Sequence, residues 1–294
     1  MDVRFDLSRF EPVNGQKPFR VLDRHRSGRA IALQYGGGSD NAAGIWDYEA
    51  GKLLGAGETA LPIYTSGSTV PALCWSADGR QVILLRDQYH YQPELHHIIG
   101  SPLQSEYTHY LERWSWPDLE QVAVCTIQPP TGWMETIAVS PDGDLAAFTW
   151  CDQDGTGFEL VRLSSDGDEQ LPAATCQRQY ELIYELAFSP DGRYLVLTGT
   201  GWEIQWWTDG GDRLGMPSEG GRREAGFVAV FDLGKRTLKE QRIVIDVPAG
   251  WLPSNENATA FYTPGQPRFI NSAEFAVPLQ TGEERLFSIG LYPA

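Results

Sequence analysis

Residues 183–200, IYELAFSPDGRYLVLTGT, decide the fold of this chain. Apolar side chains alternate along residues 184–188, which is the period of a strand with one buried face. The SPDG sequence at residues 189–192 favours a tight turn, because proline fixes φ, aspartate caps the turn and glycine accepts a positive φ. The apolar run at residues 194–197 predicts a strand covered on both faces. Such a hairpin is too small to be stable alone and predicts further copies of itself.

Four more copies of this unit lie along the chain. They occupy residues 19–33, 70–85, 134–150 and, more weakly, 269–277. The turn glycines are Gly28, Gly79, Gly143 and Gly192, and Ala273 is aligned with them in the last copy. The intervals between these positions are 51, 64, 49 and 81 residues. Repeats of about 40 to 50 residues with four strands each are typical of propeller blades.

The two ends of the chain predict how the blades close. Val3, Phe5 and Leu7 alternate with polar residues and have no hairpin partner nearby, whereas the last copy supplies three strands, the third at residues 285–291. Pairing residues 2–10 with that third strand would leave no free edge at the seam. We therefore predict an all-β fold in which residues 1–294 form one propeller domain of five four-stranded blades. The alternative is six blades, with residues 203–208 in an extra sheet.

Several of these residues resemble a known family. The SPDG turns at Ser140 and Ser189, and Trp46-Asp47 at the end of a strand, are similar to WD40 and WD40-like propeller repeats. Phe231-Asp232-Leu233 resembles a variant of the same strand end. The resemblance covers most of residues 18–247, without the Gly-His dipeptide usual in eukaryotic WD40 repeats. It implies a propeller and leaves the function open, because the scaffold hosts both binding proteins and enzymes.

Composition excludes several classes of protein. A formal net charge of −16, with 23 basic and 39 acidic residues, argues against a nucleic-acid or anionic-membrane partner. It suits a basic or neutral protein partner, or serves solubility alone. The N-terminus lacks the apolar core of a signal peptide, which predicts a cytoplasmic protein. Four lysines against 19 arginines are typical of a GC-rich bacterial genome.

The connections between second and third strands are long in two blades, at residues 88–106 and 201–226, whereas the first-to-second turns are short. Long loops of this kind are usually functional or disordered. These loops and neighbouring connections supply ten candidate partner- or ligand-binding residues: Tyr89, His90, Tyr91, His97, Trp133, Trp150, Trp202, Trp206, Trp207 and Trp251. Tyrosine and tryptophan are favoured at recognition sites. The alternative is that these side chains pack on one another and cap the ring.

Other candidate chemistry is incomplete in the sequence. Asp152 and Asp154 have part of the spacing of a calcium loop, but the third acidic position is missing. His90, His96 and His97 lack a cysteine or clustered carboxylate that would complete a metal site. The four cysteines are widely spread, without a zinc spacing. We therefore predict no cofactor, no bound metal and no catalytic residue.

These observations favour a non-catalytic module that binds a protein or peptide on the face of the long loops. The alternative is a glycan- or metal-binding propeller, or a hydrolase with a central pocket, since tryptophan provides stacking surfaces for sugars.

Overall fold

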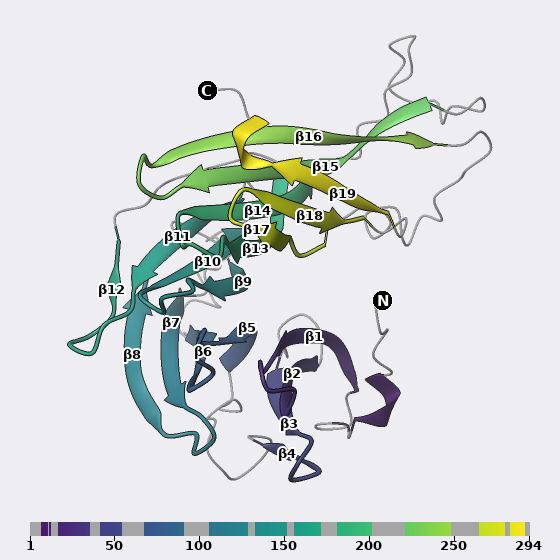
Figure 1. Ribbon diagram of the computed structural model, residues 1–294. Coiled ribbons are helices and arrows are strands. Elements are labelled where there is room, and N and C mark those ends of the chain that lie inside the picture. The colour runs from purple at the N-terminus through teal and green to yellow at the C-terminus, as the bar shows by residue number, and fades with distance from the viewer. Residues whose placement is uncertain are drawn as a thin grey trace, which may run out of the picture. The chain divides into compact units, whose positions relative to one another are not determined.

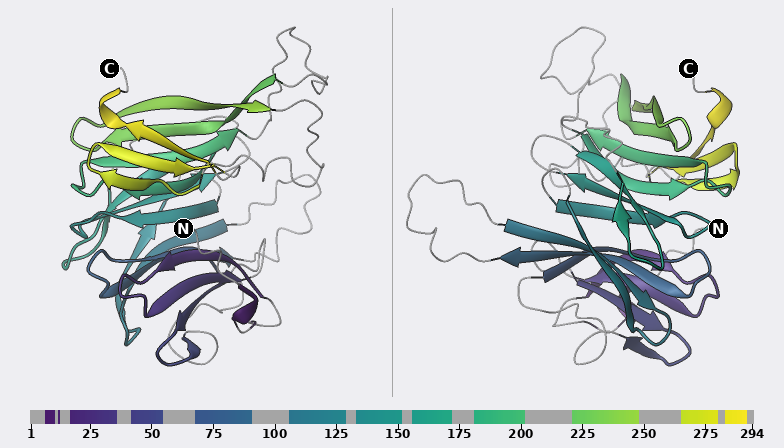
Figure 2. Two further views of the ribbon diagram at one scale, coloured as in Figure 1. Left: turned by 45° about the vertical axis from the view of Figure 1, so that its right-hand side comes forward. Right: turned by 90° about the vertical axis from the view of Figure 1, so that its left-hand side faces the viewer.

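The structure is a computed structural model (Figures 1 and 2). It describes residues 7–10, 12, 17–35, 42–54, 68–90, 106–128, 133–151, 156–171, 181–201, 221–247, 265–279 and 283–291.

The first two sheets are antiparallel and have four strands each, arranged in chain order. The first contains β1 (Pro18–Arg24), β2 (Ala30–Tyr35), β3 (Ala42–Asp47) and β4 (Lys52–Leu54). The second contains β5 (Ser68–Trp75), β6 (Gln81–His90), β7 (Glu106–Ser115) and β8 (Gln121–Ile127).

The remaining sheets repeat this order. The third contains β9 (Trp133–Val139), β10 (Leu145–Cys151), β11 (Thr156–Arg162) and β12 (Glu169–Gln170). The fourth contains β13 (Glu181–Phe188), β14 (Tyr194–Gly201), β15 (Gly221–Asp232) and β16 (Thr237–Val247). The fifth contains three described strands, β17 (Arg268–Asn271), β18 (Glu274–Pro278) and β19 (Glu284–Ser288).

The five sheets are the blades of a five-bladed β-propeller fold, which confirms the predicted fold class. The chain divides into two compact units, and the boundary between them passes through the third sheet. The extra blade proposed at residues 203–208 lies outside the described residues.

The second strand of a sheet carries much of its core, as the apolar runs predict. Every residue of β2 is buried, and so are residues 195–199 of β14. In the first unit, the side chains of β2 pack with those of β5 and β6 in one cluster that includes Leu33, Leu73 and Leu84. In the second unit, Val196 of β14 packs with Val230 of β15 and with Phe275 of β18. Burial of this apolar surface is the main force that holds neighbouring strands together.

The turn between the first two strands is built by its own side chains. In the fourth sheet, the Ser189 hydroxyl donates to Asp191 (2.6 Å) and accepts the backbone N–H of Tyr194 (2.9 Å). Asp191 also accepts the N–H of Arg193 (3.2 Å). The hydrogen bond from Ser189 lowers the pKa of Asp191 below its ordinary value. The same serine-to-aspartate bond occurs in the second sheet, from Ser76 to Asp78 (2.7 Å).

One backbone hydrogen bond recurs in all five sheets and fixes the alignment of the repeats. The residue after the third strand donates its N–H to the carbonyl of the residue that precedes the second strand. The donor and acceptor pairs are Tyr48 and Arg29, Trp116 and Arg80, Leu163 and Asp144, Leu233 and Arg193, and Ile289 and Ala273, at 2.8 to 3.0 Å.

This bond corrects the alignment of the last repeat. Ala273 occupies the position after the turn glycine, so the predicted equivalence of Ala273 with Gly192 is wrong by one residue. The cause is a shorter turn, in which Asn271 pairs directly with Glu274. The third strand also ends earlier than predicted, at Ser288, and the 3-10 helix η4 (Ile289–Leu291) follows it.

The prediction of a strand at residues 2–10 is wrong for its last part. Leu7 lies in the 3-10 helix η1 (Leu7–Arg9), and the N–H of Phe10 donates to the Leu7 carbonyl (3.3 Å). In a 3-10 turn, residues three apart share one side, so both apolar side chains can pack on the first sheet. Phe10 meets the Trp46 ring edge-on at a centroid distance of 5.5 Å. Residues 1–6 lie outside the described residues, so closure by this segment remains a prediction.

His25 links the turns of the first two sheets. In the turn of the first sheet, His25 occupies the position that Ser189 has in the fourth. Its Nδ1 lies 2.7 Å from the Ser27 hydroxyl. Its Nε2 donates to the carbonyl of Gly79 in the next sheet (2.9 Å). The imidazole also packs edge-on against Trp75, at a centroid distance of 5.6 Å. The two turns are thereby joined by both a polar and an aromatic contact.

Replacing Gly79 with alanine should destabilise the protein more than replacing Gly28. Both glycines have positive φ (72° and 71°), which costs an alanine about 1 kcal/mol. A Cβ at Gly79 would lie 2.6 Å from His25 Nε2, whereas a Cβ at Gly28 meets nothing within 4 Å. Urea unfolding of Gly79→Ala and Gly28→Ala measures the difference. Equal losses of unfolding free energy would contradict the role of the His25 contact.

Candidate functional site

The candidate site lies where β6 ends and β7 begins, at the long connection between them. The two strands pair without interruption from Gln81 and Ser115 to His90 and Glu106. Residues 91–105 therefore leave the second sheet from this end. Arg86 and Asp87 of β6 lie near this end of the sheet. Together with residues of β7 they form two polar clusters, one on each face of the sheet.

The first cluster is centred on Arg86 of β6. Its Nε donates to Glu112 Oε1 (2.7 Å), and its Nη1 donates to Gln88 Oε1 (2.7 Å). The guanidinium also lies over the Tyr110 ring, with Cζ 4.2 Å from the ring centroid. Glu112 has a side chain only 2% exposed, and its Oε2 accepts the indole N–H of Trp114 (3.0 Å). The buried carboxylate is thus hydrogen-bonded through both oxygens, as buried charges require.

The second cluster is a buried carboxylate–imidazole pair. Asp87 and His109 are cross-strand partners, and His109 Nδ1 donates to Asp87 Oδ1 (2.7 Å). Both residues are at most 9% exposed. Such a pair fixes the orientation and tautomer of the imidazole. It can therefore hold the end of β6 and the start of β7 rigidly next to the long connection.

The structure places four of the ten predicted site residues. Tyr89 and His90 lie in β6, paired with Tyr107 and Glu106, and Trp133 begins β9. Trp150 lies in β10 and is 1% exposed, so it belongs to the core and not to a binding surface. The predicted residues Tyr91, His97, Trp202, Trp206, Trp207 and Trp251 lie outside the described residues, as do Asp152 and Asp154.

The burial of Trp150 has a visible cause. A Cβ added to Gly157 of β11 would lie 2.6 Å from Cζ2 of Trp150, so the glycine provides the room that the indole occupies. A glycine inside a strand often marks such a close approach. This glycine is the signal in the sequence that could have assigned Trp150 to the core.

The sequence prediction missed the polar clusters. Arg86 and Asp87 directly follow the apolar run of β6, and His109 and Glu112 lie within β7. The available signal is the presence of four ionisable residues inside two adjacent strands, because buried charges are rarely unpaired. Which side chains face each other depends on the strand register, which the sequence did not specify.

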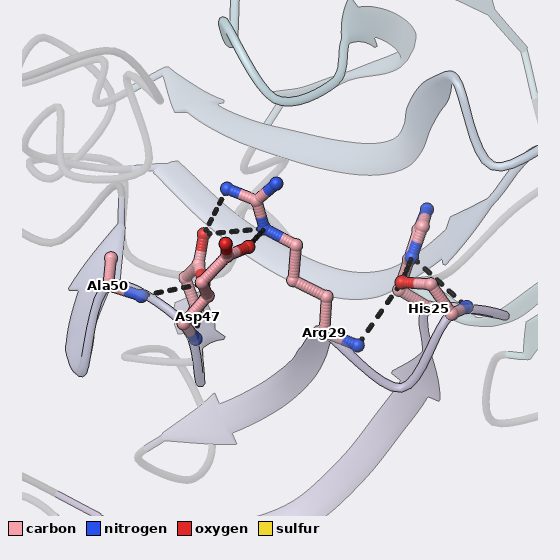
Figure 3. A network of polar contacts seen from close by, with 6 residues as sticks. His25, Arg29, Asp47 and Ala50 are labelled. Atoms are coloured by element: carbon pink, nitrogen blue, oxygen red, sulfur yellow. Dashed lines mark hydrogen bonds and ion pairs between the residues drawn. The ribbon is translucent and has the colours of Figure 1, made fainter.

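A third polar network lies in the first sheet, at the end that carries the short turn between β1 and β2 (Figure 3). Asp47, at the end of β3, accepts the backbone N–H groups of Glu49 (2.8 Å) and Ala50 (3.0 Å). Its other oxygen accepts from the Arg29 guanidinium (3.3 Å). Burial raises the pKa of Asp47, but these three donors outweigh it and hold the pKa below its ordinary value.

The Asp47 network is a repeated structural element. In the fourth sheet, Asp232 accepts the N–H groups of Gly234 (3.1 Å) and Lys235 (3.0 Å), and Arg193 lies 3.7 Å from its carboxylate. An arrangement found in two sheets stabilises the turn after the third strand. The Arg86 and Asp87 clusters belong to the second sheet and its long connection, which makes them the better support for a specific site.

The described part of the chain contains neither a metal-binding cluster nor a membrane-spanning helix. No group of three or more histidine, cysteine, aspartate or glutamate side chains is arranged to hold a metal ion there. No helix within these residues has the length and apolar character needed to cross a membrane.

Comparison with known proteins shows the fold. No protein-family model matches the chain, and no curated protein matches its sequence. Hydrazine synthase from Kuenenia stuttgartiensis is 13% identical with a TM-score of 0.51, and the match covers 90% of this chain and 70% of that one. The Cps50 (Swd1) β-propeller domain from Myceliophteria thermophila is 12% identical with a TM-score of 0.50, covering 95% and 68%.

A third solved structure is KlAtg21 in complex with the coiled coil of AgAtg16. It is 16% identical with a TM-score of 0.50, and the match covers 95% of this chain and 67% of that one. These similarities support a β-propeller. Membership of the WD40-like repeat family remains a prediction.

Replacing Glu112 with glutamine should lower the free energy of unfolding by about 3 kcal/mol, because Arg86, whose side chain is only 15% exposed, would lose its buried counter-ion. Urea unfolding measures this loss. The control is Glu169→Gln, which removes a 3.0 Å ion pair to Arg162 between side chains more than half exposed. That change should cost no more than about 0.5 kcal/mol. A loss at Glu112 as small as the control would show that the cluster contributes little.

Asp47→Asn should cost about 1 to 2 kcal/mol at pH 7. Because the pKa of Asp47 is lower in the folded protein, the ionised carboxylate stabilises the fold above its unfolded pKa of about 3.9. This contribution is lost as the pH falls through the folded pKa. Unfolding of both proteins at pH 7 and in acid should therefore show a difference that shrinks in acid. Glu49→Gln, at a carboxylate 71% exposed, is the control. A pH-independent difference for Asp47→Asn would contradict the assignment.

Proposed function

We propose that this protein is a non-catalytic module that binds a protein or peptide through the face of its long second-to-third-strand connections. The observation that carries the proposal is the register of the second sheet, in which His90 pairs with Glu106 and residues 91–105 must leave from one end. In the fourth sheet, residues 202–220 leave from the corresponding end, between β14 and β15. These two segments contain five of the ten predicted site residues, namely Tyr91, His97, Trp202, Trp206 and Trp207.

The base of the first segment supports a binding role. Two hydrogen-bonded pairs lie there. Arg86 donates to Glu112, and His109 donates to Asp87, each at 2.7 Å. A rigid base lowers the entropy lost when a loop orders against a partner. The opposite ends of the sheets carry short turns, such as residues 189–194, whose polar groups are used within the turn.

The similar structures supply a precedent from a protein of the same fold. KlAtg21 forms a complex with a coiled coil, and it shares the propeller with this chain at 16% identity. Hydrazine synthase, which is also similar in structure to this chain, is an enzyme by its name. The fold therefore permits both functions, and the choice of a binding module depends on the loops of this chain.

The partner should be captured with tagged wild-type protein, identified, purified and then titrated. Trp206→Ala with Trp207→Ala should weaken its binding at least about tenfold, because aromatic anchors dominate interfaces of this kind. Ile270→Ala, which truncates a side chain 52% exposed on β17, is the matched control and should bind normally.

Two results would overturn the proposal. One is full binding by the folded double-tryptophan variant. The other is a large fall in its melting temperature, which would show that the tryptophans cap the fold instead of contacting a partner.

A further inference from the structure

β8, the outermost strand of the second sheet, exposes an apolar row. It follows β7 at the end of the sheet order, and no strand is paired to its far side within the described residues. Val122 is 50% exposed and Val124 is 52% exposed, and alternate residues share one face. The sequence of the strand, QVAVCTI, contains no charged residue, proline or glycine. An edge of this composition is a template for another strand.

The outer strands of the other sheets differ from β8. Each contains at least one charged residue: Lys52 in β4, Glu169 in β12, Lys239, Glu240 and Arg242 in β16, and Glu284 and Arg285 in β19. Charged side chains on an edge strand oppose pairing with other chains. Among the outer strands that the structure describes, β8 is therefore the one without this protection.

Hydrogen bonds at both ends of β8 and its pairing with β7 hold the strand in place. At its start, the Ser115 hydroxyl accepts the N–H of Glu120 (3.1 Å). After its end, the N–H of Gln128 donates to Gln170 Oε1 (2.9 Å), and Gln170 Nε2 donates to the Gln128 carbonyl (3.2 Å). Along its length, Val124 pairs with Glu112 of β7, the residue held by Arg86. A strand fixed at both ends and along one side loses little entropy when a further strand joins it.

We propose that β8 is a strand-addition site that takes an extended, apolar and neutral or basic segment of a partner protein. Backbone hydrogen bonds would provide affinity, and β-branched or aromatic residues at alternate positions would contact Val122 and Val124. Asp118 and Glu120, both exposed, flank the start of the strand and favour a lysine or arginine there. Two copies of a chain of charge −16 repel each other, which disfavours a second copy as the occupant. Val122 and Val124 are not among the residues proposed above for the long-loop face, so the two sites can be tested by different substitutions.

The test is selection of short random peptides, displayed on phage, against the full-length protein. Selected peptides should alternate β-branched or aromatic residues with polar ones and should carry lysine or arginine. Their affinity, measured by fluorescence anisotropy, should fall at least about tenfold for Val122→Lys with Val124→Lys. N-methylation of alternate peptide nitrogens should remove binding, because it blocks strand pairing. Leu286→Lys, at a side chain 73% exposed on β19, is the control and should bind normally.

The remaining outcomes separate this site from the one under Proposed function. Unchanged melting temperatures would show that the lysine variants are folded, as expected for exposed positions. Peptides that lose affinity for the Trp206→Ala, Trp207→Ala variant but not for the β8 variant would overturn the strand-addition site and leave the long-loop face intact. Failure to select any peptide that depends on β8 would also overturn it. Self-association of the wild type that the β8 substitutions abolish would identify a second copy as the occupant instead.

Discussion

Burial of the second strand on both of its faces is the constraint on which this structure depends. β2 is buried along its whole length, and β14 is buried over residues 195–199. A strand of this kind needs a pairing partner on each side and a packed layer above and below. In the first unit, β2 finds that layer in residues of β5 and β6, including Leu73 and Leu84. Because one sheet cannot bury both faces of its second strand, a stable fold requires neighbouring copies of the sheet.

The predictable part of the fold follows directly from this requirement. Apolar runs and SPDG-type turns predicted the first two strands of the first four sheets, at residues 19–33, 70–85, 134–150 and 183–200. The two-residue strand β12 was missed, because Glu169 and Gln170 are too few and too polar to show a period. Leu7 was assigned to a strand because it continues an alternation, yet it shares one side of a 3-10 turn with Phe10. Local patterns do not reveal such tertiary preferences.

The candidate site was less predictable than the fold, for a physical reason. The sequence indicated which connections are long, but pairs such as Asp87 with His109 exist only through the register of β6 and β7. Trp150 shows the reverse error, since an aromatic residue near a loop was taken for surface although Gly157 makes room for it inside. The Asp47 network helps to separate the two kinds of polar cluster. Its recurrence at Asp232 indicates a structural role, whereas the Arg86 cluster supports one particular connection.

His25 has a consequence for how the protein can be observed. A carbonyl oxygen only accepts, so the bond from Nε2 to Gly79 requires a hydrogen on Nε2, and the neutral ring then offers Nδ1 to the Ser27 hydroxyl. One tautomer is thereby selected by the turn of the adjacent sheet. Nitrogen chemical shifts of imidazole distinguish the two tautomers. Solution NMR of the 15N-enriched protein would therefore report, from this single ring and without an attached probe, whether the turns of the first two sheets are joined.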